Sequence, residues 1–464
     1  MIFFQLNRES PIPLSRQLYE QLQLRIVSGE LLPGYRLPSS RRFARDHGIS
    51  RNLVTEVYET LVIEGYLESR TGAGTFVSSG AVLKSFRPRL HESEPEEEKS
   101  VKVSGVRFET GIPASLFPRG HWGRCLRDAV LYGRNELFGY GYTNGIPELQ
   151  TSLRTWLGIS KGIDCRKNQI MIFPGTHQAV RLLMELFTDD DRWGVIEDPL
   201  LPSLRTLVLD SGGKILPVPL DEEGMKTGEI PRDLAVKYLM VTPSHNFPLS
   251  GIMTIQRRIE LIDYVRRTGA WIIENDYDGE LIYKGPVLSS LYLLAPDKVI
   301  HIGSFSGTMY PGLKIAYMIV PQKLVESVVL QKERLRLTCP HLEQLALARF
   351  MDSGYYDAHV SRLKKHYFHL YRHLAARLNA CFSGRVEILG IGAGQYLTAR
   401  FPGTVFDEDL RKKLEKAGFS AYFGHDTTSC PGDYADILVF SFGMLDKEEI
   451  SRGVDILADV LNHC

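Results

Sequence analysis

The segment GSFSGTMYPGLKIAY (residues 303–317) joins two short apolar runs, VIHIG (299–303) and AYMIV (316–320). Similar runs come earlier in the chain, and stretches with helical patterns separate them: IMIF (170–173), WGVI (193–196), YLMV (238–241) and WIIEND (271–276). Short buried strands that alternate with helices are typical of a largely parallel sheet with helices on both faces. The sequence therefore predicts an α/β domain around residues 303–317.

Polar and glycine-rich stretches follow several of these predicted strands: FPGTHQAV (173–180), TPSHNFPLSG (242–251) and ENDYDGEL (274–281). In open α/β sheets, ligands bind beyond the carboxyl ends of the strands. We expect the candidate chemistry of this chain to lie at that edge of the sheet.

The composition is that of a soluble globular protein, and 464 residues are enough for two or three cores. The formal net charge is zero, so any nucleic-acid binding must come from a local surface. No apolar run is long enough to span a bilayer, and MIFFQL (1–6) is too short for the core of a signal peptide. We expect a cytoplasmic protein without a membrane partner.

The six cysteines are scattered and show neither CxxC nor Cys/His ligand spacing. This pattern predicts mostly buried thiols in a reducing cytosol, and it predicts neither disulfides nor a metal site.

Residues 78–106 have little apolar periodicity and carry an acidic cluster between Glu92 and Glu98. Such a stretch cannot bury enough apolar surface to offset its ordering entropy. We therefore predict a front module at 1–78, a flexible linker at 79–106, and a large module at 107–464. The acidic cluster is interpreted as a solvated spacer, with an acidic interaction motif as the alternative.

The front module has the pattern of three helices and a hairpin. Apolar residues recur every fourth position from Leu14 to Ile26, a second helix starts after Pro38-Ser39-Ser40, and Ser50 begins a third after a glycine turn. The segments LESR (67–70) and GTFV (74–77) then flank a tight turn. This layout places its recognition helix in the DNA major groove, although a small packing module with solvated arginines is the alternative.

The front sequence LPSSRRFARDHGISRNLVTEVYETLVIEGYL (37–67), followed by RTGAGTFV (70–77), resembles the winged helix-turn-helix of GntR-type bacterial regulators. The resemblance implies double-stranded DNA, with operator half-sites, as a partner. One departure is Leu53, where the family usually has Thr. The expected DNA-binding residues are Arg41, Ser50, Arg51, Asn52, Arg70, Gly72 and Gly74.

The loops of the large module, together with ETGIPASLFP (109–118) and FGYGYTNGIPELQ (138–150), resemble the fold-type I aminotransferases. A GntR-type head on such a module resembles the MocR/GabR-type regulators. The expected fold is a winged helix-turn-helix domain plus aminotransferase-like large and small domains, with the small domain at roughly 340–464.

The resemblance implies a site for pyridoxal 5′-phosphate. Gly175, Thr176 and His177 open a helix whose N-terminus suits an anion. Lys314 replaces the usual phosphate-binding Arg, so the positive charge stays but the bidentate fork is lost. The resemblance further implies that Ser304 and Ser306 supply hydroxyl donors to the phosphate. It places Asn246 and Tyr277 near the phenolic oxygen of the cofactor and Asn275 near its ring nitrogen. Tyr140 matches a tyrosine that contacts the phosphate in the neighbouring subunit of a dimer.

Several positions that carry the chemistry in such enzymes are replaced. Gly307 stands where the Schiff-base lysine is expected, and Asn275 where an Asp keeps the pyridine nitrogen protonated. Asp276 should point to the opposite face, because a strand alternates its side chains. Leu200 and Leu201 follow Pro199 where an aromatic often covers the ring, and Gly443 in SFGM (441–444) stands where an Arg grips the substrate carboxylate. We therefore expect no catalytic residue.

These observations predict a homodimeric transcriptional regulator, not an enzyme, that senses a small molecule. The effector would be pyridoxal 5′-phosphate, bound only non-covalently, or an amino compound. Two alternatives are an active aminotransferase with a DNA-binding head and a regulator whose dimer body binds no ligand. In the last case no cofactor is present.

Overall fold

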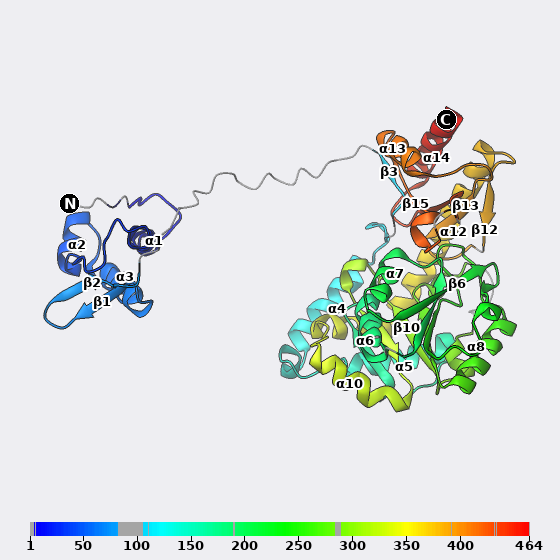
Figure 1. The fold of residues 1–464 in the computed structure, drawn as a ribbon, viewed down its shortest axis with the longest axis horizontal. Coiled ribbons are helices and arrows are strands. Elements are labelled where there is room, and N and C mark those ends of the chain that lie inside the picture. The colour runs from blue at the N-terminus through cyan, green and yellow to red at the C-terminus, as the bar shows by residue number, and fades with distance from the viewer. Residues whose placement is uncertain are drawn as a thin grey trace. The chain divides into compact units, whose positions relative to one another are not determined.

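A computed structural model describes residues 4, 6–81, 105–109, 111–188, 191–283, 289–390, 392–430, 432 and 434–463. The chain divides into two compact units, Met1–Lys102 and Val103–Cys464, which Figure 1 shows as a small head and a larger body. Most of the predicted linker at 79–106 lies outside the described residues. No described helix is long and apolar enough to cross a membrane.

The head consists of α1 (Leu14–Val27), α2 (Ser40–His47), α3 (Arg51–Ile63) and a hairpin of β1 (Leu67–Arg70) with β2 (Gly74–Val77). Ser39 Oγ accepts the N–H of Arg42 at the start of α2, and Gly48 ends that helix with a φ of 64°. The buried faces of the three helices meet in one core with Leu67 and Val77 of the hairpin. The predicted helix-turn-helix and wing are confirmed.

The large sheet has the strand order β4-β11-β10-β9-β8-β5-β6-β7. Its strands are β4 (Ile170–Phe173), β5 (Trp193–Asp198), β6 (Lys214–Asp221), β7 (Gly224–Met225), β8 (Val236–Val241), β9 (Trp271–Asp276), β10 (Val299–Ser304) and β11 (Ala316–Ile319). The pairs from β10 to β6 are parallel, whereas β11 runs antiparallel to both β10 and β4. The predicted α/β fold is confirmed.

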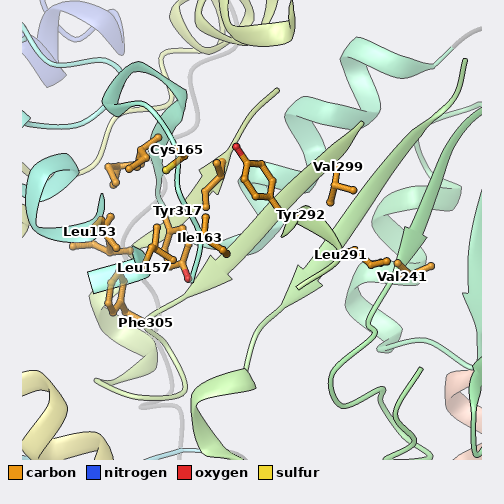
Figure 2. Packing of buried hydrophobic residues seen from close by; sticks show 14 of the residues in the cluster. Leu153, Leu157, Ile163, Cys165, Val241, Leu291, Tyr292, Val299, Phe305 and Tyr317 are labelled. Atoms are coloured by element: carbon orange, nitrogen blue, oxygen red, sulfur yellow. The ribbon is translucent and has the colours of Figure 1, made fainter. Parts of the chain in front are cut away.

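Helices cover both faces of this sheet. Ile272 of β9 belongs to the core cluster that includes α5 (Pro147–Lys161) and α8 (Ile255–Thr268), and Ile273 belongs to the cluster that includes α6 (Thr176–Phe187) and α7 (Pro202–Leu209). Figure 2 shows the first cluster, where Leu153 and Leu157 of α5 lie near Tyr317 of β11. The remaining helices of the large part are α4 (Arg119–Tyr132), α9 (Leu291–Leu294), α10 (Val325–Arg334) and α11 (His341–Asp352).

The C-terminal part has its own core around a four-stranded sheet with the order β12-β13-β16-β15. Its elements are α12 (Tyr355–Cys381), β12 (Glu387–Leu389), β13 (Tyr396–Arg400), α13 (Glu408–Lys416), β14 (Phe419–Ser420), β15 (Tyr422–Phe423), β16 (Ile437–Ser441) and α14 (Lys447–Asn462). The short strand β3 (Val106–Arg107) pairs with β14, so the start of the large module packs into this part.

Candidate functional site

The candidate site lies where β4, β8, β9 and β10 end. The antiparallel strand β11 lies between β4 and β10, so these two strands run in the same direction and their carboxyl ends share one edge with those of β8 and β9. The loops after these strands carry Gly175, Asn246, Tyr277 and Ser306. The fold therefore brings most of the predicted cofactor residues to one edge of the sheet.

The predicted phosphate cup combines a helix N-terminus with one cation. Gly175 precedes α6 with a φ of 95°, and Thr176 and His177 are the first helical residues, whose N–H groups have no partner within the helix. A Cβ atom built on Gly175 would lie 3.9 Å from Lys314 Cδ. Lys314 is exposed and has a φ of 52°. This arrangement provides the backbone donors and the charge that an anion requires.

His177 adds a polar group beside this cup. Its Nε2 lies 2.8 Å from Ser203 Oγ. Burial, and then the nearby positive charge of Lys314, lower the pKa of His177, which favours the neutral ring at neutral pH. Ser304 Oγ, at the end of β10, accepts the N–H of Ser306 at 3.1 Å. The Ser304 hydroxyl proton is then available for a further acceptor.

Two buried asparagines carry polar atoms without partners among the described residues. Asn246 Oδ1 accepts the N–H of Gly251 at 3.0 Å, but its Nδ2 has no partner. Asn275 is 4% exposed, and its Oδ1 has none either. Unpaired buried amide atoms are costly, so they are expected where a ligand supplies the missing partner.

A chain of hydroxyl groups connects Tyr277 to the Asn246 loop. The Tyr277 hydroxyl donates to that of Tyr396 at 3.1 Å, which in turn donates to the carbonyl of Asn246 at 2.8 Å. Burial raises the pKa of both tyrosines well above the usual value, so both stay neutral. Tyr396 lies in β13, so this chain joins the C-terminal part to the site.

Position 307 has room for a Cβ atom. A Cβ atom built on Gly307 would meet only the Tyr277 carbonyl at 3.6 Å and Gln395 Nε2 at 3.7 Å, both ordinary contacts. The glycine is therefore not required by crowding.

The position predicted for the carboxylate-binding Arg is tightly packed. A Cβ atom on Gly443 would lie 2.3 Å from the Gly111 carbonyl and 2.6 Å from Gln395 Oε1. The next residue, Met444, packs its side chain on Gly111. Neither residue carries a charge, so neither can pair with a carboxylate.

Asp276 lies away from these residues. Its carboxylate pairs with Lys161 at the end of α5, and the same amine lies 2.7 Å from Glu280 Oε1. This is the face expected from strand alternation. Leu200 is buried among the side chains of the α6 cluster. Tyr140 is 100% exposed.

Side chains that the sequence analysis missed lie at the centre of this site. Gln395 and Tyr396 come from the C-terminal part, where no motif marks them, and only their contacts reveal them. Met444 lies in the segment SFGM (441–444) that was quoted for Gly443, and its side chain packs on Gly111. Among the residues that the structure describes, no cluster of His, Cys, Asp or Glu could hold a metal ion.

The predicted DNA-binding residues of the head are all exposed: Arg41, Ser50, Arg51, Asn52, Arg70, Gly72 and Gly74. Ser50 also accepts the N–H of Leu53 and so caps α3. Leu53, which stands where the family usually has Thr, packs partly against the head core. Arg70 pairs with Glu68, and its guanidinium lies 4.8 Å from the centre of the Phe76 ring.

Comparison with known proteins identifies the class to which each module belongs. Residues 14–77 match the model for bacterial regulatory proteins of the gntR family, and residues 124–417 match aminotransferase class I and II. The body also resembles solved enzymes. One is the α-aminoadipate aminotransferase LysN of Thermus thermophilus, which is 24% identical with a TM-score of 0.71, and the match covers 77% of this chain and 92% of LysN. Another is a kynurenine aminotransferase of Pyrococcus horikoshii, which is 22% identical with a TM-score of 0.72, and the match covers 82% of this chain and 97% of that enzyme.

Relatives that match over nearly the whole chain are regulators. The probable rhizopine catabolism regulatory protein MocR of Rhizobium meliloti is 31% identical over 97% of this chain and 94% of its own length. The pyridoxine biosynthesis regulator PdxR of Corynebacterium glutamicum is 31% identical over 98% of both. The chain therefore belongs to the MocR-type transcriptional regulators, and it is a DNA-binding protein.

Proposed function

We propose that this regulator senses a small molecule in a dimeric aminotransferase-like body that performs no catalysis. The observation that carries the proposal is Gly307, because the residue that forms the covalent bond to pyridoxal 5′-phosphate in the enzymes is a lysine. A Cβ atom at position 307 would meet only ordinary contacts, so crowding of the backbone does not account for the glycine. A site that keeps its polar groups but lacks this amine is suited to holding a ligand without transforming it.

The residues present fit pyridoxal 5′-phosphate. The α6 N-terminus, Lys314 and Ser304 would hold the phosphate, and the unpaired Asn246 Nδ2 would donate to the phenolic oxygen with Tyr277 nearby. When bound, the cofactor supplies an aldehyde and an electron-withdrawing ring. Asn275 would face the ring nitrogen as a neutral amide, so it could not hold a proton there by charge.

Dimerisation is supported by an exposed apolar stretch at the end of α4 and in the loop that follows, which contains Val130, Leu131, Tyr132, Phe138 and Tyr140. Apolar surface of this kind marks interaction sites in soluble proteins. A two-fold dimer would present two heads to paired half-sites on DNA.

Equilibrium dialysis of the full chain against pyridoxal 5′-phosphate tests the proposal. We expect saturable binding that dialysis reverses, and Lys314→Ala should weaken it about tenfold because the phosphate loses its cation. Lys323→Ala, which removes another exposed lysine, is the matched control. Absence of saturable binding would favour a body without a ligand, and turnover of amino donors would favour an active enzyme.

A further inference from the structure

The side chain of Gln395 is a feature of the site that the cofactor residues do not explain. Gln395 immediately precedes β13 and is 7% exposed. Its Oε1 accepts the N–H of Gly111 at 3.0 Å, and its Nε2 donates to the carbonyl of Gly307 at 2.7 Å. One carboxamide group thus joins the start of the large module to the loop that replaces the lysine.

The same carboxamide also fills the space between two positions that matter for amino acid substrates. On one side, a Cβ atom on Gly307 would lie 3.7 Å from Nε2. On the other side, a Cβ atom on Gly443 would lie 2.6 Å from Oε1. By the resemblance to the aminotransferases, the part of an amino acid that carries its carboxylate would extend between these two positions, where the side chain of Gln395 lies.

Charge leads to the same conclusion as space. A carboxylate that leaves water needs a cation or several hydrogen-bond donors. Gly443 and Met444 are neutral, and the Gly111 N–H already donates to Gln395. A ligand with an amino acid arm would therefore have to break the Gln395 bridge and bury its carboxylate without a charged partner at this end.

We infer that Gln395 blocks the space between positions 307 and 443, which would otherwise take the amino acid part of a ligand. The effector is then a phosphorylated pyridine whose substituent at the Gly307 end is short and carries no carboxylate. The inference rests on the proposed sensing function and narrows it. Of the two effectors predicted from the sequence, it selects pyridoxal 5′-phosphate over an amino compound, and it excludes an adduct of the phosphorylated ring with an amino acid. Gln395 acts as a specificity-determining residue.

Isothermal titration of the full chain with two phosphorylated probes tests the inference. Pyridoxamine 5′-phosphate has the short arm, and N-(5′-phosphopyridoxyl)-L-leucine has the same ring with an amino acid attached. We expect the leucine compound to bind about tenfold more weakly or worse, because it must displace the bridge and bury a charge. In Gln395→Ala the difference should shrink to roughly threefold or less as space opens.

Gln169→Ala is the matched control. Gln169 is also buried, and it also bridges two backbone groups, the N–H of Arg166 and the carbonyl of Val320, but it lies at the other end of β4. This variant should keep the discrimination of the wild type. Equal or tighter binding of the leucine compound by the wild type would overturn the inference while leaving sensing intact. This wild-type comparison decides even where Gln395→Ala fails to fold.

A variant Gln395→Ala that folds and still discriminates as the wild type does would overturn the role of Gln395. If neither compound binds the wild type, the sensing proposal fails together with the inference.

Discussion

At the scale of single residues, the proposed function requires groups that bind a ligand but not the groups that carry catalysis in the aminotransferases. Gly175, Asn246 and Tyr277 lie at the sheet edge with donors and hydroxyls available, whereas Gly307 and Asn275 offer no amine and no charge. Gln395 adds a bridge across the same site. Under the proposed function, this site would retain polar recognition of a ligand and would have no acid or base for proton transfer at positions 307 and 275.

Glu197 gives a prediction about stability and pH. This carboxylate, at the end of β5, is 2% exposed, and only Oε2 has a partner, the N–H of Thr242. Burial raises its pKa from 4.5 to about 7. Above pH 4.5 the carboxyl group of the unfolded chain loses its proton, whereas that of the folded chain keeps it up to about pH 7. The free energy of unfolding therefore falls as the pH rises through this range, and the loss is complete above the folded-state pKa.

We therefore expect the wild type to lose roughly 3 kcal/mol of stability between pH 4.5 and pH 7.5 relative to Glu197→Gln, whose amide can still accept from Thr242. Urea unfolding followed by tryptophan fluorescence measures this, because all four tryptophans, Trp122, Trp156, Trp193 and Trp271, lie in the body. Stability curves that run parallel over this range would contradict the assignment.

Which residues fill the site was only partly predictable. Gly175 and Ser304 follow predicted strands, so strand order and motif placed them correctly at the edge. Gln395 lies more than eighty residues from Gly307 in the chain, and its contact depends on how the C-terminal part packs. A long-range contact of this kind has no periodic or local signal, so the sequence alone could not predict it.

At the scale of elements, strands with continuous apolar character were predictable and strands with mixed character were not. β4, β9 and β10 are buried along their whole length apart from Trp271, and the sequence shows them as apolar runs. β6 (KILPVPLD) contains two prolines and lies near the sheet edge, beside the two-residue strand β7, so its sequence does not look like a central strand. The head followed local rules throughout, because caps and glycine turns set its boundaries.

The wing gives a prediction about DNA binding. Glu68 in β1 pairs with Arg70, so a negative charge lies beside a predicted DNA contact. Glu68→Gln should strengthen binding to duplex DNA about two- to fivefold at low salt, because repulsion from the phosphates is removed. Fluorescence anisotropy with a labelled duplex at two salt concentrations measures the change.

Glu30→Gln is the control for this experiment, since Glu30 is an exposed acid near Arg25 outside the helix-turn-helix and the wing. Weaker binding by Glu68→Gln would show instead that Glu68 holds Arg70 in position for DNA.

At the scale of the whole molecule, the proposed function requires two chains. Leu131 is 62% exposed within the apolar stretch of residues 130–140. Leu131→Glu should convert a dimer into monomers, because a buried unpaired charge at an interface costs several kcal/mol, roughly 3 or more. Sedimentation velocity measures the state of association. Val405→Glu, also at 62% exposure but in the C-terminal part, should leave it unchanged; a dimer that survives Leu131→Glu would exclude this surface.

The most direct test of the account is the intact mass of the full chain after incubation with pyridoxal 5′-phosphate and reduction with borohydride, followed by peptide mapping. We predict that the wild type gains no stoichiometric pyridoxyl group at any single residue of the site. Gly307→Lys should gain one at position 307, because the new side chain supplies the missing amine and its Cβ atom meets only ordinary contacts. A stoichiometric adduct on one side chain of the wild-type site would contradict the central claim that this pocket holds its ligand without a covalent bond.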